Sequence, residues 1–162
     1  MIRDAVIADA KGIGAIWNPV IRDTAITFNS VEKSDREIAD LVAQRQATGR
    51  CFLVAEDGLG IAGFASYDQF RGGAGYRLCM EHSILLQPRA WGKGLGRALM
   101  TALETHARTA GAHVMVAGVS AENPEGRAFH EALGYKLTGT LPEVGHKFGR
   151  FMDLWLLQKI LT

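Results

Sequence analysis

Apolar residues recur at the spacing of an α-helix in two segments near the amino terminus. Between residues 9 and 21 they fall three or four positions apart, so they share one face of a helix. A second helix starts at Ser34, which forms a capping box with Glu37, and it ends at Gly49. A short apolar stretch at residues 1–6 predicts a strand. The chain is therefore predicted to begin with a strand followed by two helices.

Three further apolar runs predict consecutive strands. Residues 51–56 and 61–69 flank Asp57-Gly58-Leu59-Gly60, a sequence typical of a β-hairpin. Residues 77–86 form the third strand, and side-chain alternation gives it two different faces. One face carries Leu78, Met80, His82, Ile84 and Leu86, and the other carries Arg77, Cys79, Glu81 and Ser83. The second face is unexpectedly polar.

The carboxyl-terminal half continues with alternating helices and strands. A helix starts at Asn123, a favoured N-cap followed by proline, and Gly134 is well placed to end it. The elements predicted around it are a helix from residue 95 to about 111, strands at 113–119, 136–144 and 151–160, and a connection at 145–150. The predicted order is βααβββαβαββ, and 162 residues are expected to form one domain.

Composition excludes several classes of protein. The net charge is +1, from 18 Lys and Arg against 17 Asp and Glu, so no overall field attracts nucleic acid or a membrane surface. Cys51 and Cys79 are too few for a disulfide framework or a zinc site, and no metal is expected. The amino terminus has no secretory leader, and no apolar run approaches the ~20 residues that cross a bilayer. A cytoplasmic protein without nucleic-acid or membrane partners is therefore expected.

Residues 87–97 link the predicted strand at 77–86 to the following helix. The loop has glycines at alternate positions: Gly92, Gly94 and Gly96. Such spacing lets the backbone turn tightly and expose N–H groups beside the positive end of a helix, which suits a phosphate or pyrophosphate. A Walker loop is excluded because glycine follows Lys93, and a dinucleotide fingerprint would need its third glycine at Arg97. The alternative is a glycine-rich turn with a solvated basic face.

The spacing Arg89-x-x-Gly92-x-Gly94 resembles the acetyl-coenzyme A loop of the GCN5-related N-acetyltransferases, the GNAT superfamily. Glu-Asn-Pro at 122–124, Phe129-His130-Glu131-x-x-Gly134-Tyr135 and the element order also match that superfamily. The resemblance covers nearly the whole chain. It implies a GNAT α/β fold with a mixed, mostly antiparallel central sheet flanked by helices, acetyl-CoA as co-substrate, and a homodimer.

Three other segments resemble the phosphinothricin and methionine sulfoximine acetyltransferase branch. They are Thr27-Phe28, Tyr76-Arg77 with Glu81, and the closing segment at 144–151. Asn29 departs from the branch, because many relatives carry Glu after the Thr-Phe pair. This departure bears on the preferred substrate and leaves the reaction type unchanged.

Two residues are candidates for acid–base chemistry. Transfer of an acetyl group from a thioester to an amine requires a neutral amine, a stabilised oxyanion and a proton for the thiolate, and it requires no metal. Glu81 is the candidate base, and the alternative is that it simply pairs with Arg77. His130 occupies the position where the wider superfamily usually has a tyrosine proton donor, and the alternative is a solvated histidine on the helix surface. His82, on the apolar face, is expected to be a hydrogen-bonded core or interface residue.

The resemblance also implies two sets of binding residues. The set for acetyl-CoA is Ile84, Leu86, Arg89, Trp91, Gly92, Lys93, Gly94, Leu95, Gly96, Arg97 and Asn123. The set for the acceptor is Phe28, Asn29, Arg77, Glu81, Lys147, Phe148 and Arg150. In this second set the three cations would hold a carboxylate or phosphinate, and the two phenylalanines would wall the side chain. The alternative for each of them is surface charge or core packing.

The leading hypothesis is an acetyl-CoA-dependent N-acetyltransferase that works by direct transfer in a ternary complex. Its acceptor would be the α-amine of phosphinothricin, methionine sulfoximine or methionine sulfone. One alternative is another amine, such as a polyamine, an antibiotic or a protein amino terminus, although the three cations would repel a polyamine. The other is a non-catalytic acyl-CoA sensor.

Overall fold

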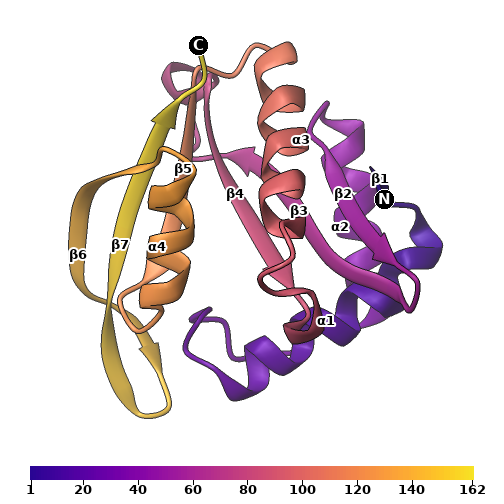
Figure 1. The fold of residues 1–162 in the computed structure, drawn as a ribbon. Helices are drawn as coiled ribbons and strands as arrows, with labels where there is room; N and C mark the ends of the chain where they lie inside the picture. The colour runs from indigo at the N-terminus through magenta and orange to yellow at the C-terminus, as the bar shows by residue number, and fades with distance from the viewer.

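The computed structural model describes residues 1–162 and contains a single seven-stranded sheet with helices on both faces (Figure 1). The strands are β1 (Ile2–Asp4), β2 (Phe52–Asp57), β3 (Gly60–Gln69), β4 (Cys79–Leu86), β5 (Val114–Ser120), β6 (Lys136–Lys147) and β7 (Arg150–Ile160). The helices are α1 (Ala10–Asp23), α2 (Asp35–Ala47), α3 (Leu95–Thr109) and α4 (Pro124–Ala132). The predicted element order and fold class are confirmed.

The strands lie in the order β1-β2-β3-β4-β5-β7-β6, and β4 with β5 is the parallel pair in a sheet that is otherwise antiparallel. This parallel pairing is short. It joins Cys79–His82 to Val114–Ala117, whereas β4 continues to Leu86 and β5 continues to Ser120. The two strands therefore separate toward their carboxyl ends, and we call this gap the β4–β5 opening.

Side-chain alternation along the strands divides the core into two layers. In β2, Leu53 and Ala55 contact the layer beneath α3, whereas Phe52 and Val54 contact the layer beneath α1 and α2. In β4, Met80 belongs to the α3 layer, and Leu85 packs against the α1–α2 layer. Adjacent residues of β4 at the opening therefore face different halves of the molecule.

Two predicted helix caps are present in the structure. The Ser34 hydroxyl accepts a hydrogen bond from the Glu37 N–H at 3.1 Å, and α2 begins at the next residue. The Asn123 side chain accepts from the Gly126 N–H at 3.0 Å at the start of α4. These caps fix where the two helices begin.

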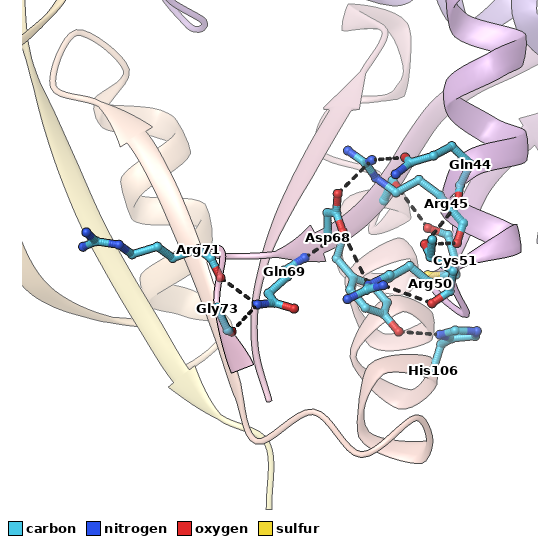
Figure 2. Close-up of polar contacts among 12 residues, drawn as sticks. Gln44, Arg45, Arg50, Cys51, Asp68, Gln69, Arg71, Gly73 and His106 are labelled. Atoms are coloured by element: carbon cyan, nitrogen blue, oxygen red, sulfur yellow. Dashed lines mark hydrogen bonds and ion pairs between the residues drawn. The ribbon is translucent and has the colours of Figure 1, made fainter. Parts of the chain in front are cut away.

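The predicted strand at 77–86 begins two residues too early. A 3-10 turn at Ala74–Tyr76 precedes β4, and Arg77 caps that turn. Leu78 therefore lies outside the strand and is 44% exposed instead of sharing a buried face. The polar cluster in Figure 2 anchors the preceding segment, because the Gln69 amide donates to the carbonyls of Arg71 and Gly73.

The predicted connection at 145–150 is also wrong. β6 extends to Lys147 and β7 starts at Arg150, so only two residues form the turn. Phe148 and Gly149 have φ values of 55° and 72°, as a two-residue hairpin turn of the type that matches the strand twist requires. Glycine and charged residues within this stretch obscured the strand pattern.

None of the four helices is long and apolar enough to span a lipid bilayer.

Candidate active site

A cavity of about 710 Å³ lies at the β4–β5 opening. Its walls come from the end of β4, residues 90–97 of the loop and the start of α3, one side of α4 from Asn123 to Leu133, and two residues at or after the end of α1, Val20 and Ile26. Most of the lining is apolar, which is typical of a site for a small molecule or cofactor. We call this space the main cavity.

The glycine loop meets the main cavity at the start of α3. Gly92 and Gly94 have φ values of 72° and 81°, a conformation that L-residues with side chains rarely adopt. Gly94 is the N-cap of α3 and provides no side-chain acceptor, so the first N–H groups of that helix receive no protein cap. The residues present therefore fit a pyrophosphate, which these N–H groups and the helix dipole would hold.

Gly96 has a different role from the other two glycines. A Cβ at this position would lie 2.9 Å from Cε1 of Phe129 and 3.0 Å from Cδ1 of Leu86. The absence of a side chain at Gly96 thus allows α3 to lie close to α4 and to the end of β4. Gly92 and Gly94 thus allow the backbone conformation of the loop, and Gly96 allows the close packing.

All but two of the predicted cofactor residues line the main cavity. They are Ile84, Leu86, Trp91, Gly92, Gly94, Leu95, Gly96, Arg97 and Asn123. Arg89 turns away and pairs with Asp57 in the β2–β3 hairpin, with Nε 3.0 Å from Oδ2. Lys93 is exposed and does not line the cavity.

A smaller cavity of about 180 Å³ adjoins the main cavity at the point where β4 and β5 diverge. The two cavities share Ile26, Ile84, Leu85 and Asn123. The rest of the smaller cavity is lined by Trp17, Thr27, His82, Ser83, Ala117, Gly118, Val119 and His130. It lies between the loop after α1 and the histidine of α4, so reacting groups could meet there.

Glu81 is a partly buried carboxylate that makes no hydrogen bond or ion pair with the protein. Arg77, its expected alternative partner, is exposed and donates instead to the carbonyl of Ala74 at 3.4 Å. A Cβ at Gly118 would lie 2.9 Å from Oε2 of Glu81, so the carboxylate rests against the backbone of β5. Burial raises the pKa of the Glu81 carboxyl above its usual value. An ion pair with Arg77 does not account for Glu81.

His130 and His82 form a buried pair. Their exposed fractions are 6% and 7%, and their Nε2 atoms are 2.9 Å apart. Nδ1 of His130 is 2.7 Å from the carbonyl oxygen of Gly126 in α4. Burial lowers the pKa of His130, and burial with the neighbouring His130 lowers the pKa of His82 to about 3. A solvated helix-surface histidine is therefore not what the structure contains at position 130.

The predicted acceptor cations are not brought together within one chain. Lys147 is 4% exposed, and its Nζ donates to the carbonyls of Thr24 at 2.6 Å and Thr27 at 2.9 Å. Arg150 pairs with Glu122 at 2.5 Å on the surface. None of Arg77, Lys147 and Arg150 lines either cavity.

The remaining predicted acceptor residues lie around the loop after α1 and the β6–β7 hairpin. The Phe28 ring lies against the backbone of Gly145, where a Cβ would come within 2.5 Å of it. Phe148 is 53% exposed at the hairpin turn. Asn29 is exposed, and its side chain accepts from the N–H of Val31 at 3.0 Å.

Several lining residues were not predicted. Trp17 and Ile26 reach the cavities from α1 and the loop after it, and Phe129 reaches the main cavity from α4. Gly118 carried a usable signal, since a lone glycine within a strand often marks a close approach of another group. The structure has no group of three or more His, Cys, Asp or Glu residues that could hold a metal ion.

Comparison with known proteins agrees with this geometry. Residues 17–135 match the model of the acetyltransferase (GNAT) family. An L-methionine sulfoximine/L-methionine sulfone acetyltransferase of Pseudomonas aeruginosa is 40% identical over 160 residues, which cover 97% of this chain and 92% of the relative. A phosphinothricin N-acetyltransferase of Alcaligenes faecalis is 31% identical, over 95% of this chain and 79% of the relative.

Comparison with a solved structure shows that the fold is also shared. An acetyltransferase of Salmonella typhimurium with its cofactor acetyl-CoA has a TM-score of 0.95 to this chain and is 37% identical to it. The likeness covers 100% of this chain and 94% of the other. With the glycine loop at the start of α3 and the gap between β4 and β5, these matches establish that the chain belongs to the GNAT acetyltransferase family.

Proposed function

We propose that this protein is an acetyl-CoA-dependent N-acetyltransferase that acetylates the α-amine of methionine sulfoximine or methionine sulfone. The observation that carries the reaction type is Glu81, an unpaired and partly buried carboxylate whose Oε2 lies against Gly118, a residue that lines the smaller cavity. The named activity of the Pseudomonas aeruginosa relative supports the substrate class. Phosphinothricin is a weaker candidate, because the relative named for it is less similar.

Acetyl-CoA would bind in the main cavity and supply the activated acetyl group. The N–H groups of the 92–97 loop would hold the pyrophosphate, and the apolar residues Ile84 and Leu86 of β4 would flank the pantetheine arm. Asn123 caps α4 and lines both cavities, so it also faces this arm. The main cavity thus directs the acetyl group toward the smaller cavity.

Glu81 acts as the base for the acceptor ammonium group, directly or through one water molecule. Burial raises the pKa of the Glu81 carboxyl, which makes Glu81 a stronger base than an exposed glutamate. Once the neutral amine has attacked, the departing thiolate requires a proton, and the His82–His130 pair lies on the α4 side of the same opening. Glu81 and the His82–His130 pair therefore lie on opposite faces of β4.

The proposal that the acceptor is an amino acid analogue rests more on the named activity of the relatives than on the three predicted cations. Lys147 and Arg150 already have partners, so they offer little support for a carboxylate site within one chain. We retain Arg77 as the candidate carboxylate ligand, because it is exposed and has no acidic partner. Phe28, Asn29 and Phe148 remain the proposed neighbours of the acceptor side chain.

A homodimer is part of this proposal. β6 is an edge strand, and apolar side chains are exposed on it, on the β6–β7 turn and at the start of β7. They are Leu137, Leu141, Val144, Phe148 and Phe151. We also propose a cytoplasmic location, consistent with two free cysteines and no disulfide.

The test is thiol release from acetyl-CoA with a panel of amines. The panel contains methionine sulfoximine, methionine sulfone, phosphinothricin, the decarboxylated analogue of each, spermidine and a peptide with a free amino terminus. We expect the sulfoximine and sulfone to react fastest and each decarboxylated amine to react ~100-fold more slowly, since it lacks a charge-assisted contact. Faster turnover of spermidine or the peptide would overturn the substrate class. Tight binding of acetyl-CoA with no turnover of any amine would indicate the sensor instead.

A further inference from the structure

The two histidines at the β4–β5 opening come from distant parts of the chain. His82 lies on β4 and His130 lies on α4, and both line the smaller cavity. Their rings are 5.0 Å apart between centroids, and Tyr135 lies within 5.6 Å of both rings. Sequence patterns alone gave these histidines separate roles.

The hydrogen bonds around His130 determine where its proton lies. The Gly126 carbonyl oxygen can only accept, so Nδ1 of a neutral His130 carries the proton. Nε2 of His130 then carries a lone pair. Two lone pairs 2.9 Å apart would repel each other, so Nε2 of His82 donates the proton between the rings.

This arrangement leaves one nitrogen of the pair without a partner. Nδ1 of His82 is buried and makes no hydrogen bond of normal geometry, although the backbone of Val116 lies close enough to act on this ring. A buried acceptor without a donor is costly, and such a group calls for an explanation beyond packing. Both nitrogens of His130 are meanwhile engaged, so His130 cannot act as an acid independently of His82.

We propose that His82 is a positioning residue for His130, and that the two rings bind protons as one unit that takes up at most one extra proton. The proposal rests on the N-acetyltransferase function stated above. The Gly126 carbonyl sets the tautomer of His130, and the hydrogen bond from His82 holds the ring of His130 on the side of the cleft where the thiolate departs. The thiol forms with the one extra proton of the pair, and this transfer leaves both rings neutral. A second proton would place two cations 2.9 Å apart in a buried site, which is strongly unfavourable.

The charged groups around the pair are few and already compensated. Glu104 on α3 accepts from the Tyr135 hydroxyl at 3.0 Å and pairs with Lys159 of β7 at 2.7 Å. On α4 itself, Arg127 and Glu131 pair with each other at 3.2 Å. Glu81 is adjacent to His82 in sequence but belongs to the opposite face of β4. An extra proton on the pair is therefore the main variable charge on this wall.

A double-mutant cycle with kcat as readout tests the pair. His82→Leu and His130→Leu should each lower kcat about tenfold, and the double variant should be no slower than the slower single variant. His82→Gln should restore most of kcat, because its amide can donate to Nε2 of His130. His106→Leu is the matched control, since His106 bonds the Tyr67 hydroxyl at 2.9 Å outside both cavities (Figure 2). It should leave kcat unchanged.

Nitrogen NMR of the imidazole rings provides a readout that does not depend on activity. His130 should show the Nδ1–H tautomer in the unmodified protein. His82 should show the Nε2–H tautomer there and shift toward the Nδ1–H tautomer in His130→Leu, where its Nε2 has lost the acceptor. An Nε2–H tautomer for His130 in the unmodified protein overturns the proposal, as does a double variant about 100-fold slower, the product of two independent losses. If no amine is acetylated, the proposed function fails, while the tautomer measurement still decides whether the pair exists.

Discussion

Glu81 differs from Asp9 and Glu104, the two buried acids of this protein, in having no cation beside it. Asp9 and Glu104 each form an ion pair. Glu81 instead has only burial acting on it, which raises its pKa. A residue in this condition is costly for stability and useful for proton transfer, so its removal should affect turnover more than folding.

Replacing Glu81 by Gln should lower kcat by ~100-fold or more at neutral pH, because the amide cannot accept the proton of the ammonium group. Part of the loss should be recovered at high pH, where more of the amine is already neutral. The measurement is a pH profile of thiol release. Glu56→Gln is the control, since Glu56 pairs with Arg3 outside both cavities. Full activity of Glu81→Gln at neutral pH would exclude Glu81 as the base.

Gly118 controls the position of the Glu81 carboxylate. A Cβ at Gly118 would lie 2.9 Å from Oε2 of Glu81, so Gly118→Ala must displace the carboxylate. We expect kcat to fall about tenfold with a small change in Tm, because a misplaced base weakens proton transfer more than it weakens packing. Gly139→Ala in β6 is the control, since no atom lies within 4 Å of its Cβ position. An unchanged kcat would show that the carboxylate can move without loss.

At the scale of secondary-structure elements, the sequence predicted those helix starts that depend on interactions within a few residues. Ser34 and Asn123 were identified as caps because each satisfies N–H groups in its own first turn. The start of β4 at Cys79 and the two-residue turn at Phe148-Gly149 were not predicted. Both depend on the register with a neighbouring strand, and the sequence pattern does not contain this information.

The start of α3 provides a test at this scale. Gly94→Val adds a β-branched side chain at a residue with φ of 81°, so the N–H groups that face the cavity must reorient. The affinity for acetyl-CoA should fall steeply while circular dichroism shows the same fold. Lys93→Ala should have a smaller effect, because an exposed cation adds only a screened attraction. Coenzyme A titrations by calorimetry would measure both, and unchanged affinity in Gly94→Val would refute the loop assignment.

At the scale of the whole molecule, the site depends on contacts between residues far apart in the sequence. His82 meets His130 across 48 positions, and Lys147 meets Thr27 across 120. The sequence indicated which residue types the chemistry needs, and most of the residues that it predicted for the cofactor loop line the main cavity. It could not indicate that Lys147 serves two backbone carbonyls, because that partner choice exists only in the folded chain.

Lys147 joins the loop after α1 to the β6–β7 hairpin. Lys147→Met keeps most of the apolar stem but leaves the carbonyls of Thr24 and Thr27 without their donor, at a cost of about 1–3 kcal/mol in unfolding free energy. Because the loop carries Ile26 and Thr27 of the smaller cavity, KM for the amine should rise more than KM for acetyl-CoA. Steady-state kinetics and urea unfolding measure the two effects. Lys136→Met, at an exposed position of β6, is the control, and equal changes in both KM values would contradict the prediction.

β7 lies between β5 and β6 in the sheet, although it follows every other strand in the sequence. A nascent chain on the ribosome therefore carries β5 with its outer edge unpaired until residues 150–160 have emerged. β5 supplies Gly118 and Val119 to the smaller cavity, so this part of the site is completed last, well after the glycine loop has been synthesised. The time between the emergence of β5 and that of β7 sets how long the open edge is available to other chains.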